Sequence, residues 1–333
     1  MTHFRRSSGA AALALTLALT ALLPCPAAAL LHRDQPEPPA LTAQGNRPPI
    51  AKNMELDTYK NVAVTGYFDA ADHEGTALTF RITGDPVRGS LSPAEDGSSR
   101  FVYTPYENKT GRDSFTYVAV DEAGNRSPEA TVTIRIRKPE TSVTYADLEG
   151  NPAHKAAVRL AEQDLLVGQC VGGQYFFHPE QPVSRAQFLT LAMAAVGAEP
   201  MDGVTLTGFS DDGEIPAWAK GSVSAALRAG VIQGGRDETG APVFQAEHTI
   251  TRAEAAVMLD RLLELTDVPA EVFAPDGGQH WASQAAANLT ASGVLRPEES
   301  APLSQPLDLE NAVLLLDGAI DLVEARSNAL WFR

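Results

Sequence analysis

The chain has 333 residues, with 26 Lys and Arg against 42 Asp and Glu, so its formal net charge is −16 at pH 7. This acidic balance argues against nucleic acid and anionic membranes as partners, because binding to phosphates relies on clustered Lys and Arg. A chain of this length exceeds one ordinary hydrophobic core, so we expect two or more domains.

The N-terminus has the features of a secretory signal peptide. Arg5 and Arg6 precede an apolar stretch at 10–23, and small residues follow at 27–29, as a signal peptidase requires. We therefore expect residues 1–29 to be cleaved from a secreted protein. No later stretch of the sequence is long and apolar enough to cross a membrane, so no membrane contact is expected after cleavage.

A Pro-rich linker and a strand-rich segment follow. Residues 30–49 contain five prolines and few apolar side chains, which is typical of an extended linker. Within 50–138, polar and apolar residues alternate in short runs separated by turns rich in Gly, Asp and Asn. This pattern predicts an antiparallel β-sandwich.

Landmarks in this segment also resemble the bacterial cadherin-like and Ig-like repeat family. They are Asn46-Arg47-Pro48-Pro49, Gly89-Ser90-Leu91, Phe101-Val102-Tyr103-Thr104-Pro105, Gly111-Arg112-Asp113-Ser114-Phe115-Thr116-Tyr117 and Asp121-Glu122-Ala123-Gly124-Asn125. The resemblance implies a spacer or an adhesive module, whose ligand would be a surface glycan or protein.

Two features of the sandwich have a functional and a structural interpretation. Asp69, Asp72 and Glu74 lie close in sequence and are candidate Ca²⁺ ligands, but no full ligand set is visible, which favours a solvated polar turn. Tyr103 and Tyr117, with Tyr106, could form a sugar-binding face, although strand aromatics more often pack in the core. No cofactor is expected.

A segment recurs three times in the second half of the chain. The clearest copy contains Phe209-Ser210-Asp211, Trp218-Ala219, Gly230-Val231-Ile232-Gln233-Gly234 and Ile250-Thr251-Arg252-Ala253-Glu254. Earlier counterparts include Tyr145-Ala146-Asp147, Leu165-Leu166-Val167-Gly168 and Val183-Ser184-Arg185-Ala186-Gln187, and later ones include Trp281-Ala282 and Gly293-Val294-Leu295. Repeats of this length are modules that pack on one another.

At these residues the chain resembles the S-layer homology (SLH) family, with repeats at 144–199, 208–266 and, in degenerate form, 273–324. The resemblance implies an all-α bundle of three modules. It also implies attachment to the wall of a Gram-positive bacterium through an acidic secondary wall polysaccharide, for example one carrying pyruvate ketals.

Each module reads as helix, loop, helix. Thr251 with Glu254, and Ser184 with Gln187, form capping boxes in which each side chain satisfies a free N–H at the start of the second helix. In the third copy Leu307 replaces the capping residue and Asp308 stands where Arg is expected, although Asp308 could shift the cap by one position.

The candidate polysaccharide-binding residues follow from the same motifs. Cations in the first turn of a helix are disfavoured by the helix dipole, so Arg185 and Arg252 suggest forked anion sites completed by helix N–H groups; a surface salt bridge is the alternative. We expect grooves that pair Arg185 with Trp218, and Arg252 with Trp281. The two indoles could instead serve mainly as core. The remaining candidates are Gly168, Gly234 and Asp211.

The sequence therefore predicts a non-enzymatic, wall-anchored surface protein with the β-sandwich as spacer or display module. One alternative is an adhesin whose sandwich binds an external ligand. The other is an accessory to a wall glycan hydrolase, which the lack of a recognisable acid pair disfavours. Cys170, the lone Cys after cleavage, cannot form an intramolecular disulfide and is expected to be an inert thiol.

Overall fold

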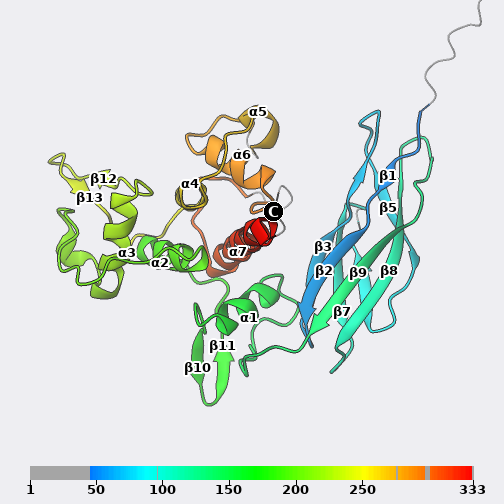
Figure 1. The fold of residues 1–333 in the computed structure, drawn as a ribbon, viewed down its shortest axis with the longest axis horizontal. Coiled ribbons are helices and arrows are strands. Elements are labelled where there is room, and N and C mark those ends of the chain that lie inside the picture. The colour runs from blue at the N-terminus through cyan, green and yellow to red at the C-terminus, as the bar shows by residue number, and fades with distance from the viewer. Residues whose placement is uncertain (1–45, 96, 275–276, 297–300, 332–333) are drawn as a thin grey trace, which may run out of the picture. The chain divides into compact units, whose positions relative to one another are not determined.

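The computed structural model describes residues 46–95, 97–274, 277–296 and 301–331. The predicted signal peptide and most of the predicted linker lie outside these residues. The chain first forms a β-sandwich and then a helical region, as Figure 1 shows.

The sandwich consists of two main sheets and a short strand pair. One sheet has the order β2-β9-β8-β5 and the other β3-β7-β6, while β1 pairs with β4. The bounds are β1 Ile50–Ala51, β2 Met54–Tyr59, β3 Val64–Tyr67, β4 Ala70–Ala71, β5 Thr79–Gly84, β6 Gly89–Pro93, β7 Arg100–Pro105, β8 Gly111–Val120 and β9 Ala130–Arg137. The prediction of an antiparallel sandwich is confirmed with one exception, since β2 runs parallel to β9.

Alternation of side chains explains the core of the sandwich. Along β9, Val132, Ile134 and Ile136 point inward, while the residues between them are more exposed. Tyr103 and Tyr117 are fully buried in this core, so the packing interpretation of these two aromatics is confirmed. Tyr106, in contrast, is half exposed.

The helical region repeats a pair of helices three times. Module 1 contains α1 His154–Glu162, β10 Gln169–Val171, β11 Gln174–Phe176 and α2 Arg185–Ala195. Module 2 contains the 3-10 helix η1 Asp212–Glu214, α3 Ala217–Arg228, β12 Gly235–Arg236, β13 Pro242–Val243 and α4 Arg252–Leu263. Module 3 contains α5 Ala270–Phe273, α6 Ser283–Ala291 and α7 Leu309–Trp331.

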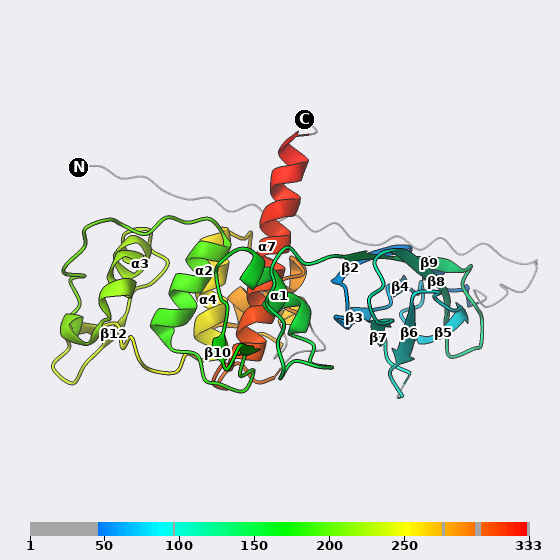
Figure 2. The same cartoon turned by 90° about the horizontal axis from the view of Figure 1, so that it is seen from below.

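The predicted interhelical loops of modules 1 and 2 contain short hairpins, which the sequence interpretation did not anticipate. In module 3, α7 continues to Trp331, past the predicted end of the repeat at 324. Figure 2 shows the C-terminal part of α7 projecting beyond the other helices.

The three modules close into a ring through backbone hydrogen bonds. The Val183 N–H donates to the Leu307 carbonyl at 3.0 Å, Leu307 donates to Ile250 at 2.8 Å, and Ile250 donates back to Val183 at 2.9 Å. Each of these residues stands two positions before the second helix of its module. The cycle establishes that the third copy, weak in sequence, occupies a place in the fold equivalent to the other two.

The helices follow the same cyclic order. The first helix of each module packs on the second helix of another: α3 on α2, α6 on α4, and α1 on α7. The central helices α2, α4 and α7 also contact one another. Small residues allow the close packing, including Ala192, Ala256 and Ala319, all buried.

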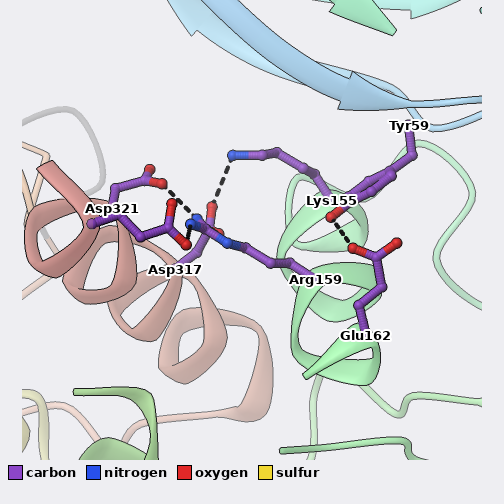
Figure 3. Close-up of polar contacts among 7 residues, drawn as sticks. Tyr59, Lys155, Arg159, Glu162, Asp317 and Asp321 are labelled. Atoms are coloured by element: carbon purple, nitrogen blue, oxygen red, sulfur yellow. Dashed lines mark hydrogen bonds and ion pairs between the residues drawn. The ribbon is translucent and has the colours of Figure 1, made fainter. Parts of the chain in front are cut away.

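A charge cluster holds α1 against α7. The Arg159 guanidinium donates to Asp317 at 2.8 Å and also pairs with Asp321 and Glu324, while Lys155 donates to Asp317 at 3.1 Å. Figure 3 shows both cations of α1 directed at the carboxylates of α7. Burial by itself raises the pKa of Asp317, but Lys155 and Arg159 outweigh this effect and hold that pKa below its ordinary value.

One hydrogen bond links the sandwich to the first helix. The Tyr59 hydroxyl at the end of β2 donates to Glu162 of α1 at 2.6 Å, as drawn in Figure 3. Burial, followed by the hydrogen bond to Glu162, raises the pKa of Tyr59. The phenol therefore stays protonated and remains a donor at neutral pH.

Candidate functional site

The loop of each of the first two modules is held by an aspartate from the start of that module. The Asp147 carboxylate accepts from the backbone N–H groups of Phe177 and His178, at 2.9 and 2.8 Å. Asp211 accepts from Phe244 and Gln245 in the same way, at 2.9 and 2.7 Å. Asp211, predicted as a binding residue, thus has a structural role that the spacing of the motif did not reveal.

These bonds stabilise an unusual backbone conformation. His178 has φ of 60° and Gln245 has φ of 59°, values in the left-handed region that side chains rarely adopt. Burial alone would raise the pKa of Asp147, but the N–H groups of Phe177 and His178 stabilise the carboxylate, so the pKa is lowered. The charged aspartate fixes the loop that carries His178.

The two turn glycines are also structural. Gly168 has φ of 73°, and a Cβ there would lie 2.5 Å from the Phe176 carbonyl oxygen. Gly234, also at φ of 73°, would place a Cβ 2.6 Å from the Val243 carbonyl oxygen. Only Gly allows the turn to lie against the hairpin.

A groove of about 550 Å³ opens beside the turn of module 1. Trp218, at the start of α3 in module 2, forms one side of it. The turn supplies apolar residues, with Leu191 of α2 and Leu309 of α7 adding to them. The volume falls within the range of about 300–1,000 Å³ that is common for small-ligand sites.

Polar side chains are distributed around this apolar surface. Gln169, Gln181 and Gln187 contribute amides, while His178 and Asp164 contribute the titratable groups. Gln187, predicted only as a capping residue, therefore has two roles, because its Oε1 also accepts from the Ser184 N–H at 3.0 Å. The Nε2 of this amide carries two N–H donors.

The tryptophans are not core residues. Trp218 is 56% exposed and Trp281 is 67% exposed, so the interpretation of the indoles as mainly core is wrong. Phe209 is buried, whereas Phe273 is partly exposed. Amphipathic indoles tolerate this position because a ring can cover apolar surface while its N–H stays in water.

Arg185 is not placed for the predicted anion site. Its Nη1 donates to Glu254 at 2.6 Å and its Nε to the Phe244 carbonyl at 2.9 Å, and the guanidinium lies over the Phe244 ring. These partners belong to module 2, and Arg185 does not line the groove that contains Trp218. Arg185 makes an ion pair, as in the salt-bridge alternative, but its side chain is only 11% exposed and its partner lies in another module.

Arg252 has an equivalent position one module further. It is buried, and its Nη1 donates to Asn311 of α7 at 2.8 Å. Trp281, its predicted partner, is largely exposed. Both arginines therefore link consecutive modules.

The helix N–H groups of the predicted anion sites are also engaged. Arg185 N–H and Ala186 N–H donate to the His248 and Ala246 carbonyls, at 2.9 and 3.0 Å. Arg252 N–H and Ala253 N–H donate to Gln305 and Leu303, both at 2.9 Å. The capping boxes at Ser184 and Thr251, confirmed in full, occupy the third N–H.

The third module shifts its cap by one position relative to the expected alignment. Asp308 accepts from the Asn311 N–H at 2.9 Å, and α7 begins at Leu309. Leu309 N–H donates to Gln181 at 2.9 Å, as the N–H groups of Arg185 and Arg252 donate to their own partners. Leu309, and not Asp308, therefore stands at the position of the two arginines.

The candidate Ca²⁺ ligands do not converge. Asp69 pairs with Lys52, Asp72 accepts from Thr76, and Glu74 accepts from the Arg47 N–H. Within the described ranges, no group of three or more His, Cys, Asp or Glu is placed to hold a metal ion. Cys170 is exposed on β10 as a free thiol.

Fold and site together define a modular architecture, in which a β-sandwich precedes three helix-pair modules with an open intermodular groove. Two family models match it. Residues 46–138 are a bacterial cadherin-like domain, and residues 208–256 are an S-layer homology domain. The second match coincides with module 2, and SLH domains associate proteins with cell-wall polysaccharide.

Solved structures resemble only part of the chain. An endo-fucoidan hydrolase variant of glycoside hydrolase family 107 is 25% identical over 29% of this chain and 14% of its own, with a TM-score of 0.24. The SrpA adhesin mutant from Streptococcus sanguinis is 19% identical over 31% of this chain and 62% of its own, with a TM-score of 0.23. The chain spans less than two thirds of either protein.

No curated protein matches the chain. None of the helices in the described ranges is both long and apolar enough to cross a membrane.

Proposed function

We propose that the chain is a secreted surface protein held non-covalently on wall polysaccharide by its helical region, with the β-sandwich as a spacer or display module. The observation that carries this proposal is the groove of module 1, where an exposed indole faces an apolar turn bordered by amides. Exposed aromatic surface beside convergent polar groups is the usual composition of a small-ligand site.

The proposed function of the groove is to bind polysaccharide without hydrolysing it. Asp164 is the one carboxylate among the residues that line the groove, all of which belong to the described part of the chain. Glycoside hydrolysis normally uses two carboxylates that flank the scissile bond. The family resemblance implies an acidic polymer as ligand, but no cationic side chain of this groove supports that finer identity.

An adhesive sandwich is the second candidate function. Val87 is 82% exposed and Tyr106 is 50% exposed, so both apolar side chains are open to solvent on the sandwich. A ligand screen on the full chain, compared with Val87→Ser/Tyr106→Ser, tests this role. Loss of a surface ligand in the variant would support an adhesin.

The wall-binding proposal is tested by co-sedimentation of the chain from residue 30 onward with purified wall sacculi, before and after hydrofluoric acid removes the secondary polymer. Sedimentation with untreated sacculi is the expected result. Loss after extraction would assign the secondary polymer, and retention would assign peptidoglycan. A chain that stays in the supernatant with untreated sacculi would contradict the proposal.

A further inference from the structure

We infer that the groove of module 1 accepts an uncharged sugar unit, and not an acidic one. This inference rests on the proposed wall-binding function and specifies the ligand class of the same site. It is carried by the charges of the groove and by one substitution among the three modules.

The charges of the groove favour a neutral ligand. Among the lining residues, which all lie in the described ranges, there is no Lys or Arg. The lining contains one carboxyl group, that of Asp164. An acidic sugar placed here would lose hydration without gaining a counter-ion and would be repelled by Asp164. A neutral sugar has neither cost.

The cyclic order of the modules explains why this groove has no guanidinium. Arg185 of module 1 lies 5.4 Å from the centre of the Phe244 ring and pairs with Glu254, both in module 2. Leu309 of module 3 contacts module 1 at the position where Arg185 of module 1 contacts module 2. In module 1, Phe177 takes the place of Phe244 and Gln187 takes the place of Glu254. At this boundary an ion pair is replaced by an apolar side chain and a neutral amide.

The remaining groups of the groove suit the hydroxyl and N-acetyl groups of a sugar. The Gln amides donate and accept hydrogen bonds without carrying charge. The Trp218 indole offers a flat apolar surface to the less polar face of a sugar ring. Gln187 is positioned by its capping bond to Ser184, so part of the polar surface is pre-organised.

The net charge of the chain is consistent with this assignment. At −16, the protein is repelled by an acidic polymer at long range, and no cationic group in the groove, whose lining lies wholly in the described residues, compensates locally. Binding to neutral segments of the wall avoids part of this repulsion.

The test compares two preparations of the same wall sacculi, one untreated and one whose carboxylates are converted to neutral methylamides by carbodiimide coupling. The chain from residue 30 onward is titrated onto both, as wild type, Trp218→Ala and Trp218→Phe. Leu206→Ala is the control, because Leu206 is an exposed apolar side chain outside the groove. Repeating the titration at about 0.05 and 0.5 M NaCl reports on residual phosphate charge.

We expect wild type to bind methylamidated sacculi at least as tightly as untreated ones, without loss of affinity at high salt. Trp218→Ala should weaken binding to both about tenfold, a size common for a buried aromatic contact, and Trp218→Phe should weaken it less. Leu206→Ala should bind like wild type.

A tenfold or greater loss of wild-type affinity on methylamidated sacculi, or at high salt, would overturn the neutral ligand while leaving wall attachment intact. Unchanged binding by Trp218→Ala would also overturn the inference, because the wall contact would then lie elsewhere. Failure of wild type to bind untreated sacculi would instead contradict the proposed function itself.

Discussion

Single residues decide whether the loops of modules 1 and 2 can form. Gly168 and Gly234 adopt positive φ where the turn meets a carbonyl of the hairpin, while Asp147 and Asp211 anchor the other end of each loop. The backbone conformation of each of these modules therefore requires a glycine at the turn and an aspartate at the other end of the loop. In module 1, Gly168 and Asp147 hold the turn and the loop that line the groove.

Gly234→Ala should therefore destabilise the protein more than a matched glycine substitution. Gly240→Ala is the control, because Gly240 has φ of 85° but a Cβ added there would have no atom within 4 Å. Positive φ costs about 1–3 kcal/mol in both variants, and the contacts with Phe209 and Val243 add to the cost only at Gly234. Thermal unfolding measures the difference; equal Tm values would contradict the structural role of the turn.

Asp317 has a pH-dependent contribution to stability. Because its folded pKa lies below the ordinary value of about 3.9, the stabilisation is complete above pH of about 4 and is lost as the pH falls through the folded pKa. Asp317→Asn leaves Arg159 and Lys155 partly uncompensated and should cost about 2 kcal/mol at neutral pH, less than for a fully isolated buried pair.

Urea unfolding at pH 7 and at about pH 3 measures this effect, and the difference between Asp317→Asn and wild type should shrink at the lower pH. Asp321→Asn is the control, since Asp321 is mostly exposed and its loss should cost under about 1 kcal/mol. A deficit for Asp317→Asn that is independent of pH would show that the carboxylate charge is not responsible.

At the scale of elements, the N-termini of α2, α4 and α7 are the joints of the helical region. The N–H groups of Arg185, Arg252 and Leu309 all donate to carbonyls of a neighbouring module, and the two arginines extend the same joints through their side chains. The motif residues at these three helix starts therefore contribute to the assembly of the modules.

A double-mutant cycle at Arg185 and Glu254 tests this assignment. Arg185→Met and Glu254→Gln should each destabilise the protein, and the coupling energy should be about 1 kcal/mol, because both side chains are partly shielded from water. Chemical denaturation of the four proteins measures it. Additive effects on stability, together with a loss of sacculus binding, would return Arg185 to the predicted anion site.

How far the sequence predicts these elements depends on the distance over which each interaction acts. The capping boxes are local, with partners three residues apart, and both were predicted correctly. The partner of Arg185 lies 69 residues away, and nothing in the local pattern identifies it. The register of the third cap also required the ring of backbone bonds, because the sequence alignment places Leu307, which has no side-chain acceptor, at the capping position and Asp308 one residue later.

The groove was predicted only in part for the same reason. The motif identifies Trp218 as a candidate residue. That its side chain is exposed beside the turn of module 1 follows only from the packing of the modules. His178 and Gln181 lie in the loop of module 1 and Leu309 lies on α7, and no sequence spacing brings these two segments together with the indole. The signal that could have found them is the correspondence between modules, which requires the cyclic order of the helices.

At the scale of the whole molecule, the chain is an acidic protein that carries a cadherin-like sandwich and an SLH domain, which we propose attaches it to a wall. The three helical modules form one ring, so a contact at one groove positions any contact at another on the same rigid framework. Such a second contact is intramolecular, and it would strengthen attachment without a tighter individual site.

The measurement that bears most directly on wall attachment through the groove is sedimentation of the chain from residue 30 onward with untreated wall sacculi, for wild type and Trp218→Ala. We predict that wild type sediments with the sacculi and that Trp218→Ala binds about tenfold more weakly with unchanged thermal stability. Equal binding by the two proteins, or no binding by wild type, would show that the groove is not the site of attachment.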